Sequence, residues 1–324
     1  EVRLYNRALS NAAIQSERAR TRSCDGAIAS FEVSAPATAS VCAPVDVTIR
    51  AKDAGGNTVS DYTGTTELTT SAGHGDWSVV NADGALSPGA DDDGTAQYEF
   101  VDSDNGEIVL GLADKRADNL TATITDVLGG QSGSSDIIEF RENALVISSA
   151  DSLGDDFVAG RDHDLTIEAL SRNSETDECG RITEYDGAID LKGWIARSAN
   201  DPGGDAPALS DASGTDTLPS SEPSANNTTL LFDEGLATAS WQTTDVGQYT
   251  LNLTDDSSAI VVDENGDPRS VSGQGAQWTV RPFGFDVTVA DNPGASSAGG
   301  SAFLAAGRPF DITIRAVAHS SGDD

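Results

Sequence analysis

The 324-residue sequence contains no methionine and few histidines, cysteines, lysines and aromatic residues. Its soft metal ligands are Cys24, Cys42, Cys179, His74, His163 and His319. They match none of the short Cys and His spacings of zinc sites, so we expect no metal binding through them. Aromatic residues make up 6% of the chain and glycine contributes 33 residues. This composition favours thin cores and many turns over long helices.

Positive charge is also scarce, because 19 Lys and Arg residues face 53 Asp and Glu residues and the formal net charge is −34. A surface this acidic repels phosphate groups, which excludes nucleic acid as a partner. Residues 1–22 differ from the rest, since five arginines against two glutamates give them a balance of +3 and leave −37 for the remainder. The first segment therefore belongs to a different domain.

Long apolar runs are missing as well. No run reaches the roughly 18 residues of a membrane helix, and no initiator methionine or signal-type apolar segment precedes Glu1. We therefore expect no membrane insertion from this stretch. The missing methionine, and a strand-like pattern that stops shortly before Asp324, indicate a piece of a longer protein.

One hexapeptide occurs three times, at residues 46–51, 164–169 and 311–316. Apolar and polar residues alternate in each copy, so one face of an extended strand would meet a core and the other face water. Each copy is predicted to be a half-buried β-strand.

Two further similarities extend this repeat. Residues 62–68 resemble 185–191, each starting with Tyr-x-Gly, and residues 94–112 resemble 235–253 without gaps. Three blocks in the same order indicate a duplicated module. The second copy holds an insertion rich in Asp, Gly, Pro, Ser and Asn at 200–229, which we expect to be a surface loop.

Short alternating segments separated by turn residues fill each module. In the first module they are 31–33, 45–51, 66–69, 96–100, 108–112, 120–125 and 137–140. This density of strands predicts an all-β chain of tandem immunoglobulin-like antiparallel β-sandwiches.

A corner motif supports the immunoglobulin-like fold. The pattern Asp245-x-Gly247-x-Tyr249 is typical of the turn where such a chain enters its F strand, with the tyrosine hydroxyl bonded to loop backbone. Ile108 takes the tyrosine's place in the first module, so the bond should be missing there.

These patterns divide the chain into four parts. Residues 1–22 form a strand and a helix over 11–20, with Ser10 as N-cap, and are the remnant of another domain. Residues 23–141 and 142–281 form the two sandwich modules. Residues 282–324 begin a third module, which cannot close a sandwich by itself.

The opening Glu1-Val-Arg-Leu-Tyr-Asn-Arg-Ala-Leu-Ser-Asn-Ala-Ala-Ile14 resembles the last strand and short helix of laminin-G/concanavalin-like jelly-roll domains. This resemblance implies that a large sandwich precedes the sequence, and that any ligand site of that domain lies outside it.

From Cys24 onward the chain resembles the MshQ-like family of surface proteins encoded with the mannose-sensitive haemagglutinin (MSHA) type IV pilus. The similarity is carried by residues 42–51, 191–195, 201–204, 244–253 and 280–283. It implies a secreted protein at the surface of a Gram-negative bacterium, linked to pilus biogenesis or adhesion, and brings no catalytic residue. The implied partners are pilus or other cell-surface components, with glycans bound through the upstream domain.

Three acidic clusters resemble parts of a calcium loop, because Ca²⁺ binds several carboxylate oxygens from a turn opened by glycine. They are Asp91, Asp92 and Asp93, then Asp102 and Asp104, and finally residues 263–267. In the repeat alignment Asp104 falls on Asp245, where only one carboxylate survives. We therefore favour structural turns, with Ca²⁺ as the alternative and the one candidate cofactor.

Cys24 and Cys42 flank the first strand of the first module. In an oxidising compartment, a disulfide between them would close a loop of about 18 residues and stabilise the module by roughly 3 kcal/mol. Both cysteines precede strands that would run antiparallel, and the starts of such strands lie far apart unless the first is bent. The pairing stays open, and Cys179 is either a free thiol or a cysteine whose partner lies outside the sequence.

Catalytic motifs are absent: we find no nucleophile elbow, phosphate-binding glycine loop or HExxH sequence. Residues 161–164, Arg-Asp-His-Asp, could suggest acid–base chemistry, but they enter the repeated strand and have no partner nucleophile. Trp77, Trp194 and Trp241 could stack on sugars if exposed. Trp241 replaces Phe100 in the repeat, so we expect it in the core.

The sequence thus favours a non-catalytic stalk or presentation region of a secreted bacterial adhesin or pilus-associated protein. The alternative is a set of accessory, non-catalytic modules of an extracellular polysaccharide-active enzyme, because Ig-like and laminin-G-like modules also accompany such enzymes. A third possibility is a linker made rigid by calcium.

Overall fold

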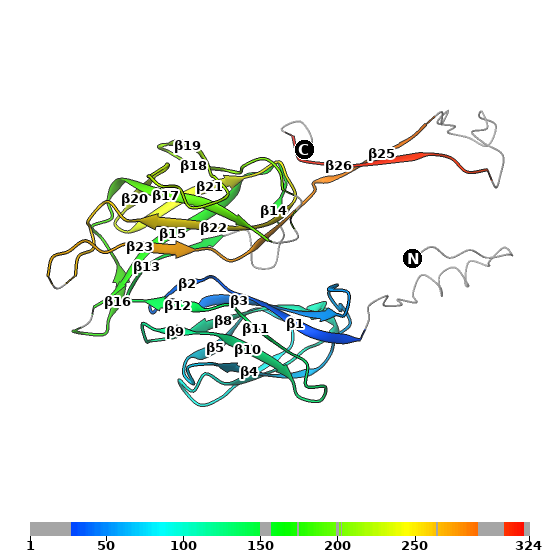
Figure 1. Cartoon of the computed structure of the whole chain (residues 1–324), viewed down its shortest axis with the longest axis horizontal. Helices are drawn as coiled ribbons and strands as arrows, with labels where there is room; N and C mark the ends of the chain where they lie inside the picture. Colours follow the sequence, from blue (N-terminus) through cyan, green and yellow to red (C-terminus); the bar gives the residue numbers. More distant parts are fainter. Residues whose placement is uncertain are drawn as a thin grey trace.

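The computed structural model describes residues 27–149, 157–173, 175–198, 201, 203–263, 265–290 and 308–320. The helix predicted at 11–20 and Cys24 lie outside these residues. Strands dominate the described chain (Figure 1), in which the short 3-10 turn η1 (Asp102–Asp104) is the only helical element. No helix in this part of the chain has the length and hydropathy needed to cross a membrane.

The first module is a sandwich of two antiparallel sheets with a small third sheet. One sheet has the order β1 (Ile28–Ser34), β3 (Val45–Asp53), β8 (Glu107–Ala113), β5 (Asp76–Asn81). The other has the order β11 (Ser132–Ser134), β10 (Ala122–Asp126), β4 (Thr65–Thr70), β7 (Ala96–Glu99), β6 (Ala85–Pro88). The third joins β2 (Thr38–Ser40), β12 (Ile138–Arg141) and β9 (Asn119–Leu120), with β2 parallel to β12.

The second module repeats this plan on one continuous path of strands. The order is β13 (Asn143–Ser149), β15 (His163–Arg172), β21 (Leu236–Gln242), β20 (Thr228–Asp233), β17 (Gly187–Arg197), β22 (Gly247–Asp255), β24 (Trp278–Arg281), β14 (Phe157–Val158). Off this path, β16 (Cys179–Arg181) pairs with β15, β18 (Ala208–Asp211) pairs with β21 and β19 (Gly214–Thr217), and β23 (Val271–Gln274) pairs with β22.

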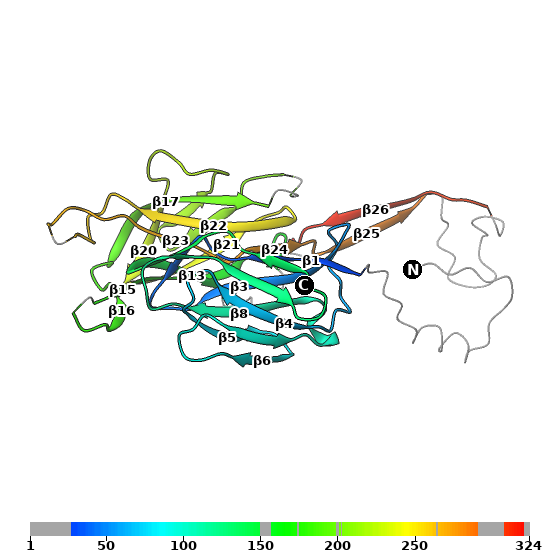
Figure 2. The ribbon, with the colours of Figure 1, turned by 60° about the horizontal axis from the view of Figure 1, so that its bottom comes forward.

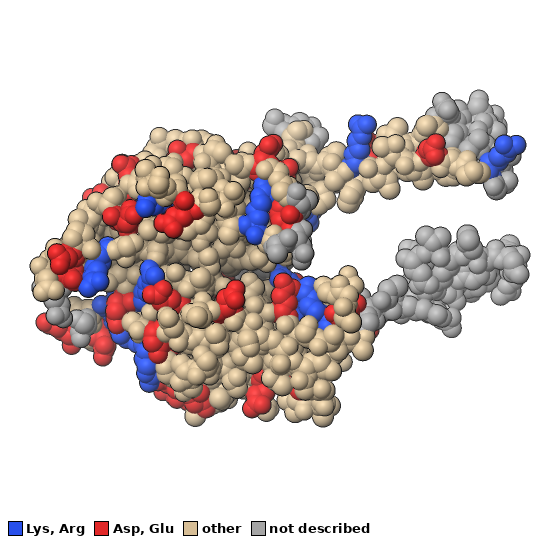
Figure 3. All heavy atoms as spheres, viewed as in Figure 1, with Lys and Arg blue, Asp and Glu red and all other residues tan. Residues whose placement is uncertain are grey.

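Acidic residues are spread over both modules on the face in Figure 3, and lysines and arginines lie between them. Many of these cations pair with a neighbouring carboxylate, as Arg50 does with Glu107 at 2.7 Å. The few positive charges are therefore compensated locally and form no broad basic face in this view.

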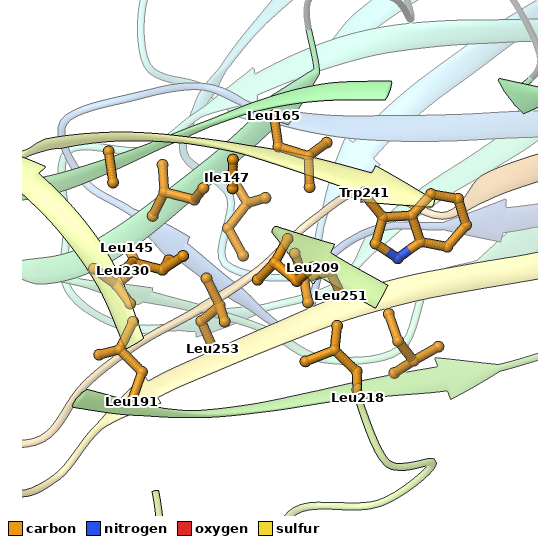
Figure 4. Packing of buried hydrophobic residues seen from close by; sticks show 14 of the residues in the cluster. Leu145, Ile147, Leu165, Leu191, Leu209, Leu218, Leu230, Trp241, Leu251 and Leu253 are labelled. Carbon is orange, nitrogen blue, oxygen red and sulfur yellow. The ribbon is translucent and has the colours of Figure 1, made fainter. Parts of the chain in front are cut away.

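Each module has its own hydrophobic core. The first contains buried residues from Phe31 to Phe140, and the second contains buried residues from Leu145 to Val280. The second is built from alternate residues of facing strands around Trp241 (Figure 4), which is fully buried. The expected module boundary between residues 141 and 142 falls between the two cores.

The strands of the first module lie where the alternation predicted them. Each of its seven predicted segments overlaps an observed strand. The first two hexapeptide copies fall within β3 and β15, and the third overlaps β26 (Ile312–Val317) in all but its first residue. Strict alternation places Val47, Ile49 and Ala51 on the core with no exposure. The prediction of all-β antiparallel sandwiches is therefore confirmed.

The predicted correspondence of residues 94–112 with 235–253 is wrong. Strand pairing makes β8 the counterpart of β21, because β3 pairs with β8 as β15 pairs with β21. The strands of the Tyr-x-Gly blocks are β4 and β17, and β4 pairs with β7 as β17 pairs with β20. β7 therefore corresponds to β20, and the counterpart of Phe100 is Phe232 and not Trp241. Each of these two phenylalanines packs edge-on against the tyrosine of its Tyr-x-Gly block. The error arose because all strands share a period of two, so an alignment shifted by one strand still matches apolar residues.

The segment 200–229 is not the plain surface loop that its composition predicted. It carries the hairpin β18–β19, which takes the place of β5–β6 because β18 pairs with β21 as β5 pairs with β8. Leu209 and Leu218 are 1% and 0% exposed and belong to the core. Leu209 lies in β18 and Leu218 directly follows β19, so the hairpin is attached to the core at both of its ends.

The strands β25 (Gly284–Val289) and β26 form a two-stranded ribbon that extends away from the sandwiches (Figures 1 and 2). The register matches that of the other modules, since Val287 faces Ile314 as Val33 faces Ile49. All of β26 is exposed, in contrast to the expected half-buried strand. Among the described residues, no strand covers β26 as β8 covers β3.

Candidate functional site

The two sandwiches lie side by side (Figure 1), with β2 of the first module against β13 and β23 of the second. The Ala37 amide donates to Gln274 Oε1 at 2.5 Å, and Arg141 Nη1 donates to Ser272 Oγ at 2.6 Å. Arg172 also donates to the backbone carbonyl of Lys115. We call this contact region between the modules the joint.

A disulfide between Cys42 and Cys179 ties the joint together. It connects residues 137 apart in sequence, with the two Cα atoms 5.4 Å apart. The suggested Cys24–Cys42 pairing is therefore wrong in this structure, and Cys179 is neither free nor without a partner. The physical reason lies in the register: β1 starts at Ile28 opposite Asp53, at the end of β3, whereas Cys42 precedes the start of β3.

The chain enters and leaves the paired modules at one end. The labels for β1 and β25 lie at the same end in Figures 1 and 2, and β16, which carries Cys179, lies at the opposite end. The pair is therefore folded back on itself, and the disulfide closes the tip far from the entry point.

A cavity of about 660 Å³ opens beside the joint and is lined by residues of both modules. Its three arginines each pair with a carboxylate, as Arg141–Glu139 at 2.7 Å, Arg172–Glu142 at 2.5 Å and Arg269–Asp263 at 3.0 Å. Hydrogen bonding to Arg141 lowers the pKa of Glu139. Because each guanidinium is already neutralised, the cavity is not built to capture an anion.

A narrower groove of about 120 Å³ between the modules is lined by Asp46, Leu145 and Ile147, among others. Burial raises the pKa of the Asp46 carboxyl. The joint therefore carries one acidic group whose charged form is disfavoured by its surroundings.

The carboxylates considered as calcium ligands are engaged by protein donors. Asp92 pairs with Arg116 at 2.7 Å, and Asp93 accepts the amides of Ala90 and Thr95 at 2.7 and 2.8 Å. These hydrogen bonds lower the pKa of Asp93. Asp91 is exposed at the same turn.

Asp102 is exposed, whereas Asp104 is buried and accepts the Tyr98 hydroxyl at 3.0 Å on both oxygens. The amides of Asp83 and Val101 also donate to Asp104. Within the described residues, Asp91–Asp93 and Asp102–Asp104 form no shared group that could hold a metal. The same holds for Asp263, which accepts two amides of its own turn.

One cluster that the sequence did not single out consists of His74, Asp114 and Asp118. His74 Nδ1 lies 2.8 Å from Asp114 Oδ2, and His74 Nε2 lies 3.1 Å from Asp118 Oδ2. We expected no metal site that includes a histidine, yet in the structure His74 lies beside two carboxylates in an arrangement that could hold a metal ion. His74 precedes Asp114 by 40 positions and Asp118 by 44, so no short motif joins it to them. The available signal was a histidine between two glycines, at residues 73–75.

The corner predicted at Asp245, Gly247 and Tyr249 lies at the start of β22. Tyr249 is fully buried under the Arg197 guanidinium, 4.6 Å from the ring centre. Burial raises the pKa of Tyr249, and a side-chain interaction with Thr243 opposes this, whereas the predicted bond from the hydroxyl to loop backbone is not formed in the described structure. Asp245 instead accepts the amide of Asp205.

The tyrosine that ties each sandwich together is the one in the Tyr-x-Gly block. Tyr62 donates to Asp126 Oδ2 at 2.5 Å, and Tyr185 donates to Asp255 Oδ2 at 2.6 Å. Each aspartate lies at the end of the neighbouring strand and also accepts amides of the following turn, as Asp126 does from Leu128. The partners are 64 and 70 residues apart, and sequence reasoning missed them because only strand pairing brings them together.

The remaining candidates are parts of the fold. His163 is buried and stacks on Phe157 with ring centres 4.2 Å apart. Trp77 and Trp241 are 5% and 0% exposed and cannot stack on an external sugar, and Trp194 is half-buried on β17. The expectation that Trp241 packs in the core is confirmed.

Solved structures similar to this chain include the D0–D1 domain of intimin, at 9% identity over 77% of this chain and 97% of that chain, with a TM-score of 0.29. Domains 5–6 of the S-layer protein SbsC match at 14% identity over 77% and 96% of the two chains, with a TM-score of 0.27. The Yersinia pseudotuberculosis adhesin InvE matches at 15% identity over 76% and 58%, with a TM-score of 0.22.

No curated protein matches the sequence. Family models do match: residues 126–267 fit the first Ig-like domain of the domain of unknown function DUF6701, and residues 281–324 fit its second domain. The first match covers most of the second sandwich, and the second begins where that sandwich ends. The chain therefore contains DUF6701 Ig-like domains.

Proposed function

We propose that this chain is a non-catalytic region of a bacterial cell-surface protein, in which two Ig-like modules form one rigid presentation unit. The observation that carries the proposal is the Cys42–Cys179 disulfide across the joint. Such bonds form and persist in oxidising compartments and are rare in the cytosol, which supports an extracellular location.

The arrangement of the modules refines the expected stalk. Two sandwiches placed end to end would lengthen the protein, whereas these lie side by side and the chain returns to its entry end (Figures 1 and 2). The pair therefore acts as a side lobe that presents its loops and the joint cavity. The MshQ-like resemblance adds an association with a type IV pilus or with adhesion.

A deletion tests this function. In the full-length protein on its native bacterium, removal of residues 27–281 should leave surface display intact and reduce agglutination or attachment. A matched control replaces Cys42 and Cys179 with serine, which keeps the modules and removes the covalent tie. Normal attachment by the deletion strain, with surface display verified by an antibody, would contradict the proposal.

A further inference from the structure

The cavity of about 660 Å³ beside the joint is shared by the two modules. Glu139 and Arg141 reach it from β12 of the first module, whereas Asn143 and Arg172 reach it from β13 and β15 of the second. Arg172 pairs with Cys179 in the β15–β16 ladder, so the cavity lies beside the disulfide. Its volume is within the range of about 300–1,000 Å³ that is usual for ligand sites. Because the disulfide holds the two halves together, the cavity exists before any ligand arrives.

The charges of the cavity lining cancel. Three arginines and three carboxylates line it, and they pair one to one in the salt bridges described above. Figure 3 shows basic and acidic side chains next to one another where the modules meet at the end that carries β16. A charged ligand would have to separate one of these pairs, whereas a neutral ligand leaves all three intact. The cavity therefore favours a neutral ligand, in a chain whose formal net charge is −34.

Hydrogen-bonding groups of the lining remain unused after these salt bridges. Arg269 donates to Asp263 through Nη2, and within the described residues its Nε and Nη1 make no hydrogen bond. Glu139 likewise accepts through Oε2 and leaves Oε1 open. In the same part of the chain, the side-chain amides of Asn143 and Asn265 have no hydrogen-bond partner. A guanidinium only donates, a carboxylate only accepts and an amide does both, so the cavity offers unused groups of both kinds.

A neutral carbohydrate matches this set of groups. Each of its hydroxyls donates one hydrogen bond and accepts up to two, so neighbouring hydroxyls of a sugar ring together bind a guanidinium or an amide. Val262 also lines the cavity and is 51% exposed, which provides an apolar contact for the C–H groups of the ring. We propose that the joint cavity binds a neutral carbohydrate through Asn143, Asn265 and Arg269. This inference rests on the proposed function, and it names the class of ligand that the lobe recognises.

A glycan microarray probed with the labelled 324-residue chain tests the proposal. The slide carries neutral oligosaccharides of glucose, galactose and mannose, acidic oligosaccharides that contain uronic acids, and a neutral glycine–serine peptide. We expect saturable binding to neutral oligosaccharides and weaker binding to the acidic ones, because a ligand carboxylate competes with the protein carboxylates for the arginines. Binding to none of the neutral oligosaccharides, or stronger binding to the acidic ones or to the peptide, would overturn the proposal.

Calorimetric titration with the neutral oligosaccharide that binds most strongly identifies the site. Arg269→Gln should weaken binding about tenfold, because it removes donors carried by a charged group, and Asn143→Ala about fivefold. The Arg269 side chain is 63% exposed, so its variant retains the fold. Arg116→Gln is the matched control, since the Arg116 side chain is 50% exposed and pairs with Asp92 at 2.7 Å outside the cavity. Equal weakening by Arg116→Gln and Arg269→Gln would overturn the assignment to this cavity.

Failure of this proposal can be told apart from failure of the proposed function. If deletion of residues 27–281 reduces attachment but the purified chain binds no neutral oligosaccharide, the presentation role stands and the carbohydrate site is wrong. If the chain binds a neutral oligosaccharide through Arg269 but the deletion strain attaches normally, the carbohydrate site stands and the presentation role is wrong.

Discussion

Tyr62 and Tyr185 each close their sandwich with one hydrogen bond to a buried aspartate. A hydrogen bond to a charged group contributes about 1.5–3 kcal/mol. We therefore expect Tyr62→Phe to lower the free energy of unfolding of the first module by that amount, and Tyr185→Phe to do the same in the second. Urea unfolding followed by fluorescence measures both.

Tyr249→Phe is the matched control for these two variants. It removes a buried hydroxyl whose side-chain partner is the uncharged Thr243, while the ring and its contact with Arg197 remain. The expected loss of unfolding free energy is smaller, about 1 kcal/mol, as for a hydrogen bond between uncharged groups. A loss as large as that of Tyr185→Phe would show that the hydrogen bonds to aspartate do not stabilise the sandwiches more than an ordinary tyrosine hydroxyl does.

The aspartates that receive these bonds make the modules sensitive to acid. Burial acts to raise the pKa of Asp126 and Asp255, but hydrogen bonds from the tyrosines and from turn amides outweigh it, and both pKa values lie below the ordinary range. An acid whose pKa is lowered by folding stabilises the protein above its unfolded pKa, and this stabilisation is lost as the pH falls through the folded value.

We therefore expect the free energy of unfolding to fall as the pH drops below about 4, the ordinary pKa of aspartate. Asp126→Asn should flatten this dependence for the first module and leave that of the second unchanged. Urea titrations at a series of acidic pH values give the slopes. Identical slopes in the wild type and the variant would contradict this assignment.

The pKa of Asp46 is shifted in the opposite direction, because burial at the joint raises it. An acid with a raised pKa favours the folded state while it is protonated, and that contribution is lost as the pH rises through the folded value. Asp46→Asn should therefore raise the melting temperature at neutral pH and change it little in acid. Asp91→Asn, at an exposed turn, serves as the control, and an equal gain there would rule out this explanation.

At the scale of elements, the same strand pair opens all three modules. In β1–β3, β13–β15 and β25–β26 the hexapeptide strand pairs antiparallel with the strand before it. The first two pairs are covered by further strands, whereas Phe285, Ile312 and Ile314 of the ribbon are more than half exposed. Sequence alternation is thus the same in the three copies, and burial differs.

This difference predicts different protection of the ribbon. An isolated two-stranded hairpin is marginally stable in water. In the 324-residue chain, amide hydrogens of β26 should exchange much faster than those of β3 and β15, as measured by mass spectrometry on peptides covering the three hexapeptides. Equal protection of all three would mean that the ribbon is covered in solution, for instance by a second copy of the chain.

At the scale of the whole molecule, the disulfide decides how the modules are held. A cross-link spanning 137 residues stabilises by up to about 5 kcal/mol in the chain-entropy model. The double variant Cys42→Ser, Cys179→Ser should therefore unfold at lower urea concentration. Its radius of gyration from small-angle X-ray scattering should increase as the joint opens, while near-UV circular dichroism of the separate cores persists.

Cys24→Ser is the control for this variant, because the disulfide joins the other two cysteines, Cys42 and Cys179. Reduction with dithiothreitol should reproduce the double variant in the wild type. An unchanged radius of gyration in the double variant would show that the contacts of β2 with β13 and β23 hold the modules without the covalent tie.

The sequence by itself determined the strands and the fold class. Alternation with a period of two is a local property, so residues such as Val47 and Ile49 could be assigned to a core face from their neighbours alone. The hexapeptide repeat similarly predicted a strand at the same place in each module. A local period cannot say which strands pair, which is why Phe100 was matched to Trp241 when its counterpart is Phe232.

Only the tertiary structure decided the contacts between residues far apart in the chain. The Cys42–Cys179 bond, the Tyr62–Asp126 bond and the meeting of His74 with Asp114 all depend on the placement of strands and modules in space. These partners carry no shared spacing or motif, since each residue type is common at turns. The physical reason is that strand pairing and module docking bring together positions that local sequence periodicity does not connect.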